Sequence, residues 1–310
     1  MKKLISLVTP CFNEADNVRE VYQQVKDVFA QMPEYRYEHI FIDNASTDKT
    51  VSILREIAKN DLNVKVIINS RNFGTMNSYY AMFQCAGDAV IQVVADLQDP
   101  PPMIKELIKK WEEGYKIVLA VKNKSEESQF MFMIRKLYYK IYNKVSNIQI
   151  VTNFCGFGLY DKTIIDILRN IDDPHPDLRS LICEIGFEKA IINYVQPKRK
   201  KGQSKHNLYD LYDQAMHGIT RDSIIPLRLA SLIGFSVATI NLLIALGYFI
   251  YKILYWQNFQ LGIAPLVIGI FFFGGVQLFF LGVIGEYIGA IFKQVKKRPL
   301  VIEKERINFD

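Results

Sequence analysis

The sequence lacks the motifs that mark several large classes of protein. Its four cysteines, Cys11, Cys85, Cys155 and Cys183, lie far apart and form no C-x-x-C pair. This spacing gives no support for a zinc site and fits reduced thiols in the cytosol. Neither G-x-G-x-x-G nor G-x-x-x-x-G-K-[ST] is present, which argues against dinucleotide binding and against a phosphate loop. The sequence also holds no internal repeat and no low-complexity tract.

We expect no signal peptide at the start of the sequence, and the sequence has no strong charge of one sign. The apolar run 4–8 follows a basic start, but it is too short and soon meets Pro10 and Glu14. The formal net charge of +6 is modest. The basic run 198–201 stands close to an apolar segment, which favours an anionic membrane surface or phosphates as its partner. We therefore expect no nucleic-acid partner.

Two long uncharged stretches stand in the C-terminal third of the chain. Residues 229–251 form a run of 23 and residues 261–285 a run of 25, whereas a helix needs about 20 apolar residues to cross a bilayer. Basic residues flank the pair, and aromatic side chains occupy the short connection. The sequence predicts two transmembrane helices over 229–292, with both termini and the rest of the protein in the cytoplasm. Two helices buried in a soluble core remain the alternative.

Before these stretches, short apolar runs alternate with segments of helical periodicity. The predicted strands are residues 4–9, 39–43, 64–68, 89–95 and 117–121. The predicted helices are residues 14–31, 48–59, 74–86 and 102–113. This alternation predicts an α/β domain with a mostly parallel sheet and helices on both faces.

Two further segments have the spacing of amphipathic helices, which can lie in the headgroup plane of a membrane. We expect residues 207–228 to form a juxtamembrane helix, whereas residues 134–145 also fit a surface helix packed on the sheet. The predicted order is a cytoplasmic domain over 1–206, this helix, the two spans over 229–292 and a basic tail over 293–310.

Polar clusters stand where three predicted strands end, at residues 10–14, 43–48 and 96–99. Because ligands of parallel sheets collect at the carboxyl ends of strands, this convergence indicates a binding site. Asn13 and Glu14 can cap a helix or contact a base edge, and Asp43 can accept hydrogen bonds from a nucleoside. Arg71 offers a charged fork to a diphosphate, and Gly74 lets the chain approach a ligand closely.

Seven stretches follow one another along the chain: TPCFNEADNV, IDNASTDKT, SRNFGTMNSYYA, VADLQDPP, RKKGQSK, IPLRLASLIG, and LGVIGEYIGAIF with KKRPL. In this order they resemble family 2 glycosyltransferases of the GT-A, or Rossmann-like, fold. The match is closest to the membrane-anchored polyprenyl-phosphate glycosyltransferases and covers nearly the whole chain. It implies inverting transfer of a hexose, with glucose from a UDP-sugar expected, to polyprenyl (undecaprenyl) phosphate at the cytoplasmic face of the inner or plasma membrane. GDP-mannose and UDP-GlcNAc remain alternative donors.

The resemblance also implies roles for individual residues. The nucleotide sugar is expected at Pro10, Asn13, Glu14, Asp43, Asn44, Arg71, Asn72, Gly74 and Asp96. The expected ligands of Mg²⁺ or Mn²⁺ are Asp96 and Gln98, and the expected catalytic residues are Asp96 and Asp99. The acceptor phosphate is expected at Lys122, Lys124, Arg199, Ser204 and Lys205.

The chain departs from the pattern of its relatives in three places. Val94 stands where many relatives have the first aspartate of Asp-Ala-Asp-Leu-Gln, and Asn44 stands where a second aspartate is common. Gly156 and Gly158 replace a carboxylate and a guanidinium, so no catalytic base is assigned there. A phosphate acceptor tolerates this loss, because its second pKa near 6 leaves it mostly dianionic at neutral pH. We take Val94 as the last buried residue of its strand.

Three further hypotheses come from the same sequence. A membrane-tethered nucleotide-sugar binder or scaffold would explain the departures without catalysis. A processive polysaccharide synthase would need more spans and a Q/R-x-x-R-W element, which neither Trp111 nor Trp256 provides. Gly285 and Gly289 in the second apolar stretch favour helix association and a homo-oligomer.

Overall fold

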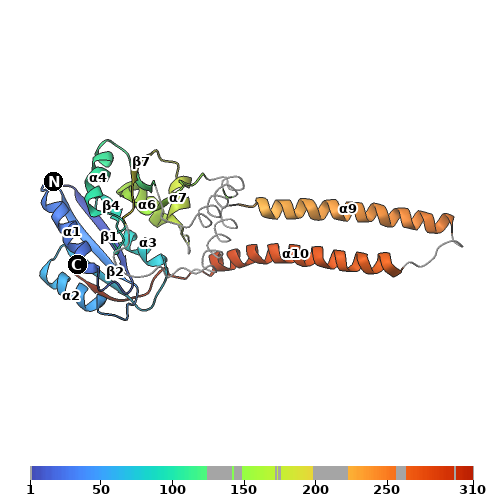
Figure 1. The fold of residues 1–310 in the computed structure, drawn as a ribbon, viewed down its shortest axis with the longest axis horizontal. Coiled ribbons are helices and arrows are strands. Elements are labelled where there is room, and N and C mark those ends of the chain that lie inside the picture. Colours follow the sequence, from blue (N-terminus) through green and yellow to red (C-terminus); the bar gives the residue numbers. More distant parts are fainter. Residues whose placement is uncertain are drawn as a thin grey trace. The chain divides into compact units, whose positions relative to one another are not determined.

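The computed structural model describes residues 2–123, 142, 149–171, 173, 176–197, 223–255, 263–296 and 298–309. The chain divides into two units (Figure 1). The first draws on Met1–Lys136, Ile148–Lys205 and Lys297–Asp310, and the second on Leu137–Asn147 and His206–Lys296. The first unit is therefore formed by segments that precede and follow the second unit in the sequence.

The first unit is built on an eight-stranded sheet with the order β7-β5-β6-β4-β1-β2-β3-β8. Its strands are β1 (Leu4–Cys11), β2 (Arg36–Asp43), β3 (Val64–Asn69), β4 (Ala89–Gln92), β5 (Ile117–Lys122), β6 (Phe154–Asp161), β7 (Lys189–Tyr194) and β8 (Glu303–Ile307). Four pairings are parallel, those of β1 with β2 and β4, β2 with β3, and β5 with β7. β6 runs antiparallel to β4 and β5, and β8 runs antiparallel to β3. The predicted α/β class with a mostly parallel sheet is confirmed.

Helices cover both faces of this sheet (Figure 1). They are α1 (Val18–Ala30), α2 (Thr50–Asn60), α3 (Met76–Phe83), the 3₁₀ turn η1 (Pro101–Met103), α4 (Ile104–Glu112), α6 (Lys162–Asn170) and α7 (Leu178–Glu184). One buried apolar cluster joins the sheet to α1, α2 and α4, and a second joins it to α3, α6 and α7. The central strands read as continuous apolar runs because both of their faces are buried.

Within each strand, neighbouring residues point to opposite faces and thus enter different clusters. In β2, Phe41 belongs to the cluster under α1, whereas Ile40 and Ile42 belong to the cluster under α3. In β1, Leu7 and Val8 divide in the same way. This two-sided burial fixes the register of the strands, because a shift by one residue would exchange their two faces.

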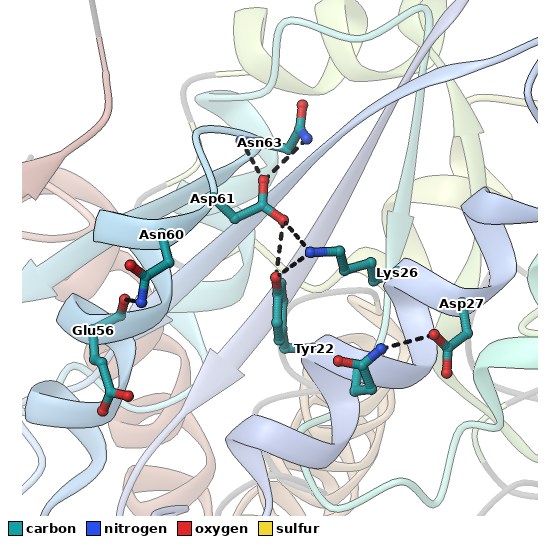
Figure 2. A network of polar contacts seen from close by, with 8 residues as sticks. Tyr22, Lys26, Asp27, Glu56, Asn60, Asp61 and Asn63 are labelled. Atoms are coloured by element: carbon teal, nitrogen blue, oxygen red, sulfur yellow. Dashed lines mark hydrogen bonds and ion pairs between the residues drawn. The ribbon is translucent and has the colours of Figure 1, made fainter.

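A polar network ties α1 to the turn that precedes β3 (Figure 2). The Asp61 Oδ2 atom accepts a hydrogen bond of 2.9 Å from the Tyr22 hydroxyl and lies 3.3 Å from the Lys26 Nζ atom. The Asp61 Oδ1 atom accepts two bonds of 3.0 Å from Asn63, one from the backbone and one from the side chain. Partial burial opposes ionisation of Asp61, but these contacts outweigh it and hold its pKa below the ordinary value.

Within the segment predicted as a basic tail, 293–310, residues 303–307 form β8 of the sheet. A charged segment suits the edge of a sheet, where one side of the strand faces water. Side chains fasten the segment further, since Glu305 pairs with Arg55 of α2 at 2.5 Å. The Asn308 Nδ2 atom donates to the carbonyl oxygens of Ala58 and Val64 at 2.7 and 2.8 Å. The C-terminal segment is thus part of the sheet domain.

The second unit contains the long helices α9 (Ile225–Leu254) and α10 (Ile263–Val295). The two helices contact each other, since Gly234 of α9 lies opposite Phe280 of α10 (Figure 1). Within the described residues, α10 holds one segment long and apolar enough to cross a membrane, Phe272–Phe292, and α9 holds a shorter apolar helix, Ile225–Asn241. Both predicted spans are therefore helical, while the crossing of a membrane by the pair stays a prediction.

The two amphipathic predictions fall almost wholly outside the described residues. Of residues 134–145 only Tyr142 is described, and of residues 207–228 only 223–228 are described. Residues 225–228 already belong to α9.

Candidate functional site

The structure brings the predicted polar clusters to one edge of the sheet. β4, β1, β2 and β3 are neighbours and run in the same direction, so the residues that follow them lie side by side. β5 and β7 run in that direction too, because β6 reverses between β4 and β5. The edge therefore carries the loops after β1 to β4 together with Lys122 and Tyr194, the last residues of β5 and β7.

The loops after β1 and β2 are fastened to each other by Asn13. Its backbone N–H donates to the Ser46 Oγ atom at 2.8 Å, and its Oδ1 atom accepts from the Thr47 N–H at 2.8 Å. Asn13 and Ala45 both adopt left-handed backbone conformations, with φ of 56° and 61°. Asn13, predicted to contact the donor, thus uses its side-chain oxygen to hold the loops together.

The other two predicted residues of this region lie beside that connection. Pro10 is half-buried near the end of β1, and Glu14 is half-buried in the following loop. The Glu14 N–H donates to the Thr50 Oγ1 atom at 2.9 Å, and its carboxylate accepts from the Asn17 Nδ2 atom at 2.6 Å. The Glu14 side chain thus binds the Asn17 side chain, whereas its main-chain carbonyl accepts from the Asn17 and Val18 N–H groups at the start of α1.

Asp43, the last residue of β2, carries a buried side-chain oxygen that makes no hydrogen bond to the described residues. The side chain is fully buried, and its Oδ2 atom accepts from the Ser46 N–H at 2.9 Å. The Oδ1 atom has no hydrogen-bond partner among the described residues. Burial raises the pKa of Asp43 above its ordinary value, and the charge of Asp48 adds to the effect. A buried acceptor without a partner typically costs about 1–3 kcal/mol, so a donor group on a ligand would be stabilising here.

Asn44, by contrast, uses its full hydrogen-bonding capacity inside the protein. Its Nδ2 atom donates to the Asn72 Oδ1 atom at 2.9 Å and to the Gly74 carbonyl at 3.1 Å. Its Oδ1 atom accepts from the Asn69 Nδ2 atom at 3.1 Å and the Phe73 N–H at 2.9 Å. A side-chain amide has two N–H donors and two lone pairs. An aspartate at this position would lose both donated bonds, which explains the amide in this chain.

The loop that Asn44 holds, residues 70–74, is called the donor loop below, after the role that the sequence predicts for it. The Asn72 Oδ1 atom also accepts from the Gly74 N–H at 2.8 Å, so Asn72 shapes the loop as well. The exposed Arg71 stacks its guanidinium 4.0 Å from the centre of the Phe73 ring. Gly74 has a φ of 64° with open space around it, so the backbone conformation, not crowding, favours glycine.

The loop after β4 differs from the sequence prediction. The strand ends at Gln92, Val93 is fully buried, and Val94 is half-buried outside the strand. Val94 is therefore not the last buried residue of the strand. The Asp96 Oδ1 atom accepts from the Gln98 N–H at 3.1 Å, which places the carboxylate and the Gln98 residue in one turn.

Asp99 lies behind this turn in a buried position. It is 4% exposed, and its Oδ1 atom accepts a 3.0 Å hydrogen bond from the Tyr194 hydroxyl. Burial raises the pKa of Asp99 to about 6 and the charge of Asp96 acts in the same direction, whereas the Tyr194 bond and the charge of Lys122 oppose the rise. Tyr194 is a site residue that sequence reasoning missed, because the segment 189–194 was not predicted as a strand.

The chain is similar in sequence to known glycosyltransferases over nearly its whole length. A family model described as glycosyl transferase family 2 matches residues 6–168. The chain belongs to glycosyl transferase family 2. It is 36% identical over 303 residues to the glycosyltransferase YkcC of Bacillus subtilis (strain 168), covering 96% of this chain and 92% of that protein. It is 35% identical over 303 residues to the bactoprenol glucosyl transferase of Shigella phage SfII, covering 97% of each.

Solved structures resemble the chain less closely. Mannosyl-3-phosphoglycerate synthase from Rubrobacter xylanophilus matches with a TM-score of 0.48 and 16% identity, covering 73% of this chain and 74% of that one. At this score the likeness adds nothing to the family membership that the sequence relatives establish.

The metal ligands predicted for this family 2 glycosyltransferase are few. In the part of the chain that the structure describes, no three His, Cys, Asp or Glu side chains gather closely enough to hold an ion. Asp96 and Gln98 offer hard oxygen atoms from one turn, and Mg²⁺ commonly takes only one or two carboxylates beside substrate phosphates and water. The residues present therefore fit an ion that a bound diphosphate helps to hold.

Two other side chains occupy the space beside Gly156 and Gly158. The buried Tyr160 hydroxyl donates to the Gly156 carbonyl at 2.9 Å. A Cβ atom on Gly158 would lie 2.6 Å from the Val118 carbonyl oxygen and 3.3 Å from the Tyr160 hydroxyl, so no larger residue fits without a shift. A Cβ atom on Gly156 would lie 3.4 Å from the Gln92 amide nitrogen. Tyr160 thus lies beside the position of a side chain at Gly158, and Gln92 lies beside the position of a side chain at Gly156.

Most of the predicted acceptor-phosphate residues cannot be placed. Lys124, Arg199, Ser204 and Lys205 lie outside the described residues. Lys122 is half-buried at the end of β5, close enough to Asp99 for its charge to lower that carboxyl's pKa. Their role in binding an acceptor stays a prediction.

Proposed function

We propose that this family 2 glycosyltransferase transfers glucose from UDP-glucose to polyprenyl phosphate at the cytoplasmic face of a membrane, with inversion at the sugar. The observation that supports the proposal is that one end of the parallel strands carries an Asp43 oxygen without a partner among the described residues, the donor loop and the Asp96–Gln98 turn. Relatives named bactoprenol glucosyl transferase, similar over nearly the whole chain, support glucose as the sugar and a polyprenol-linked acceptor.

The donor would bind across the ends of β2, β3 and β4. The free acceptor on Asp43 suits a uracil N–H or a ribose hydroxyl, since either group can donate to it. Arg71, held on Phe73, suits the diphosphate, because a guanidinium makes two parallel bonds to phosphate oxygens. Asp96 and Gln98 would hold Mg²⁺ or Mn²⁺ with that diphosphate, and the ion would supply neutralisation of charge on the leaving group.

The acceptor chemistry needs positioning more than proton removal. An oxygen of the lipid phosphate attacks C1 of the sugar, and the bond from C1 to the donor diphosphate breaks, releasing UDP. A phosphate monoester with a second pKa near 6 is already mostly dianionic at neutral pH. Lys122 adds positive charge at the same edge. The absence of a carboxylate at Gly156 is compatible with such an acceptor.

The membrane topology that we propose has two spans, α9 and α10. β1 to β7 precede α9 and β8 follows α10, yet all belong to one sheet. A helical segment whose two ends enter the same sheet has to cross a membrane an even number of times. Crossing by Phe272–Phe292 therefore requires a second crossing, for which α9 is long enough.

The purified full chain should be incubated with UDP-glucose, undecaprenyl phosphate and Mg²⁺ or Mn²⁺. We expect a glucosylated lipid on thin-layer chromatography and release of UDP in equal amount. GDP-mannose and UDP-GlcNAc in parallel reactions test the alternative donors. Absence of transfer with every donor would contradict the proposal, and UDP binding without turnover would favour a nucleotide-sugar binder that lacks activity.

A further inference from the structure

The C-terminal strand β8 contacts the chain on both sides of the donor loop. At the start of the loop, the Ser70 N–H donates to the Ile302 carbonyl at 2.9 Å, directly before β8. After the loop comes α3, and the Arg306 Nη2 atom donates to the Gln84 Oε1 atom at 2.7 Å and to the Tyr80 hydroxyl at 3.4 Å. One strand thus fastens the entry to the loop and the helix that leaves it.

Arg306 is well placed for this contact because the carboxylate of Glu303 orients it. Its Nε and Nη2 atoms donate to the two carboxylate oxygens of Glu303 at 2.5 and 2.8 Å. Such a paired geometry fixes the plane of the guanidinium. The bonds that Arg306 donates to Glu303, and more weakly to Tyr80, raise the pKa of Arg306, whereas burial opposes the rise.

An irregular register lets β8 reach the loop. Ile68 lies opposite Glu305, but the next residue, Asn69, lies opposite Glu303, so Lys304 is skipped. Bulges of this kind bend a strand and redirect its backbone groups. The bend lies beside Asn69, whose side chain donates to Asn44, the residue that holds the donor loop.

We propose that β8 is a positioning element of the donor loop and that Arg306 is its positioning residue. The strand fixes the conformation in which Arg71 meets the donor diphosphate, and neither β8 nor Arg306 touches the reacting atoms. The inference rests on the proposed function, since it takes the loop to bind a nucleotide sugar. It also gives the segment after α10 a role at the site.

The test compares Arg306→Ala with Lys304→Ala in the full chain. Both changes remove one positive charge from an exposed side chain of β8, but Lys304 stands at the skipped position and has no contact with Gln84. We expect Arg306→Ala to weaken binding of UDP with Mn²⁺ by about tenfold, to raise the KM for the donor more than it lowers kcat, and to speed hydrogen exchange over residues 70–76. Lys304→Ala should change none of these.

Two readouts keep the proposal separate from the proposed function. Unchanged UDP affinity and unchanged exchange over 70–76 in Arg306→Ala would overturn the positioning role. If the unaltered chain binds no UDP, the proposed function fails, and the exchange measurement still decides whether β8 orders the loop. Should Arg306→Ala fail to fold, Gln84→Leu removes the same contact from the α3 side, with the same expected faster exchange.

Discussion

The two halves of the sheet edge are built differently. On the β2–β3 side, Asn44 joins four groups of the donor loop and neighbouring β3, and Asn13 fastens the adjacent loops. On the β4–β6 side, the Gln92 Oε1 atom is buried without a partner among the described residues, and Asp99 has a raised pKa. The loops of the first half are joined by more contacts of their own, although the Asp43 Oδ1 atom there also lacks a partner among the described residues, and the second half leaves the Gln92 amide oxygen for a substrate to complete.

From this contrast we predict which half determines the affinity for the donor and which half determines turnover. Loops that are ordered before binding lose little conformational entropy when a ligand arrives. A site with few metal ligands and buried charged groups gains most of its favourable contacts only when the diphosphate is present. We therefore expect changes on the β2–β3 side to alter donor affinity and changes on the β4 side to alter turnover.

The largest effect is expected at Asp96. Asp96→Ala removes the one carboxylate predicted to hold the ion, so transfer should fall by about 10²–10³-fold, with little change in thermal stability. Asp27→Ala, an exposed aspartate of α1, is the matched control and should retain full activity. Retained transfer in Asp96→Ala, measured as lipid product, would remove the metal assignment and the contrast between the halves.

The next effect concerns pH and Asp99. Its pKa of about 6 lies above the ordinary 3.8, so the folded protein binds more protons than the unfolded chain between about pH 4 and 6. Stability without ligand should therefore fall as pH rises through this window, by on the order of 2–3 kcal/mol. Asp99→Asn should lose that dependence.

Thermal unfolding of both proteins at pH 4.5 and pH 7 checks this prediction. If the difference between the two proteins is the same at both pH values, the buried carboxyl does not titrate as expected. Glu106→Gln, at an exposed carboxylate of α4, should leave the pH dependence of the unaltered protein in place.

A smaller effect is expected when Asn44 is changed to aspartate. Asn44→Asp loses two donated bonds and brings a carboxylate toward two oxygen acceptors, so the donor loop should loosen. UDP affinity should fall by about tenfold, with kcat less affected. Calorimetric titration with UDP measures it, and Asn60→Asp on the exposed face of α2 is the control. A larger change in kcat than in affinity would reverse the assignment of the two halves.

The smallest effect is expected at the network in Figure 2, away from both halves. Lys26→Met breaks an ion pair of an exposed lysine, so unfolding free energy should fall by less than about 1 kcal/mol. Affinity for UDP and transfer rate should not change. A loss of activity here would mean that the site depends on stability in general, which would weaken every comparison between the two halves.

The sequence predicts the central strands well because both faces of β1 to β5 are buried and their apolar runs are continuous. It does not predict β6, because the two glycines of this strand weaken the strand pattern. It also does not predict β8, because the charges that suit a strand at the edge of a sheet are equally typical of a basic tail. These strands depend on neighbours that are distant along the chain.

The sequence predicts which residues lie at the site, but it does not predict their hydrogen-bond partners. Asp43 and Asn44 look alike in the sequence, yet one keeps an unpartnered oxygen and the other has none left to offer. That difference arises from Asn69, Phe73 and Asn72, which the β3 loop brings close. Tyr194 is missed for the same reason, since only the sheet places it against Asp99.

The position of β8 imposes an order on synthesis. The edge of β3 cannot be covered until the ribosome has completed both long helices and released the last residues of the chain. Until then β3 presents unpaired backbone groups, the kind of edge that draws in strands from other molecules. A chain shortened before α9 to obtain a soluble domain would keep that open edge permanently, and we expect it to aggregate unless residues 301–309 are supplied, fused or as a peptide.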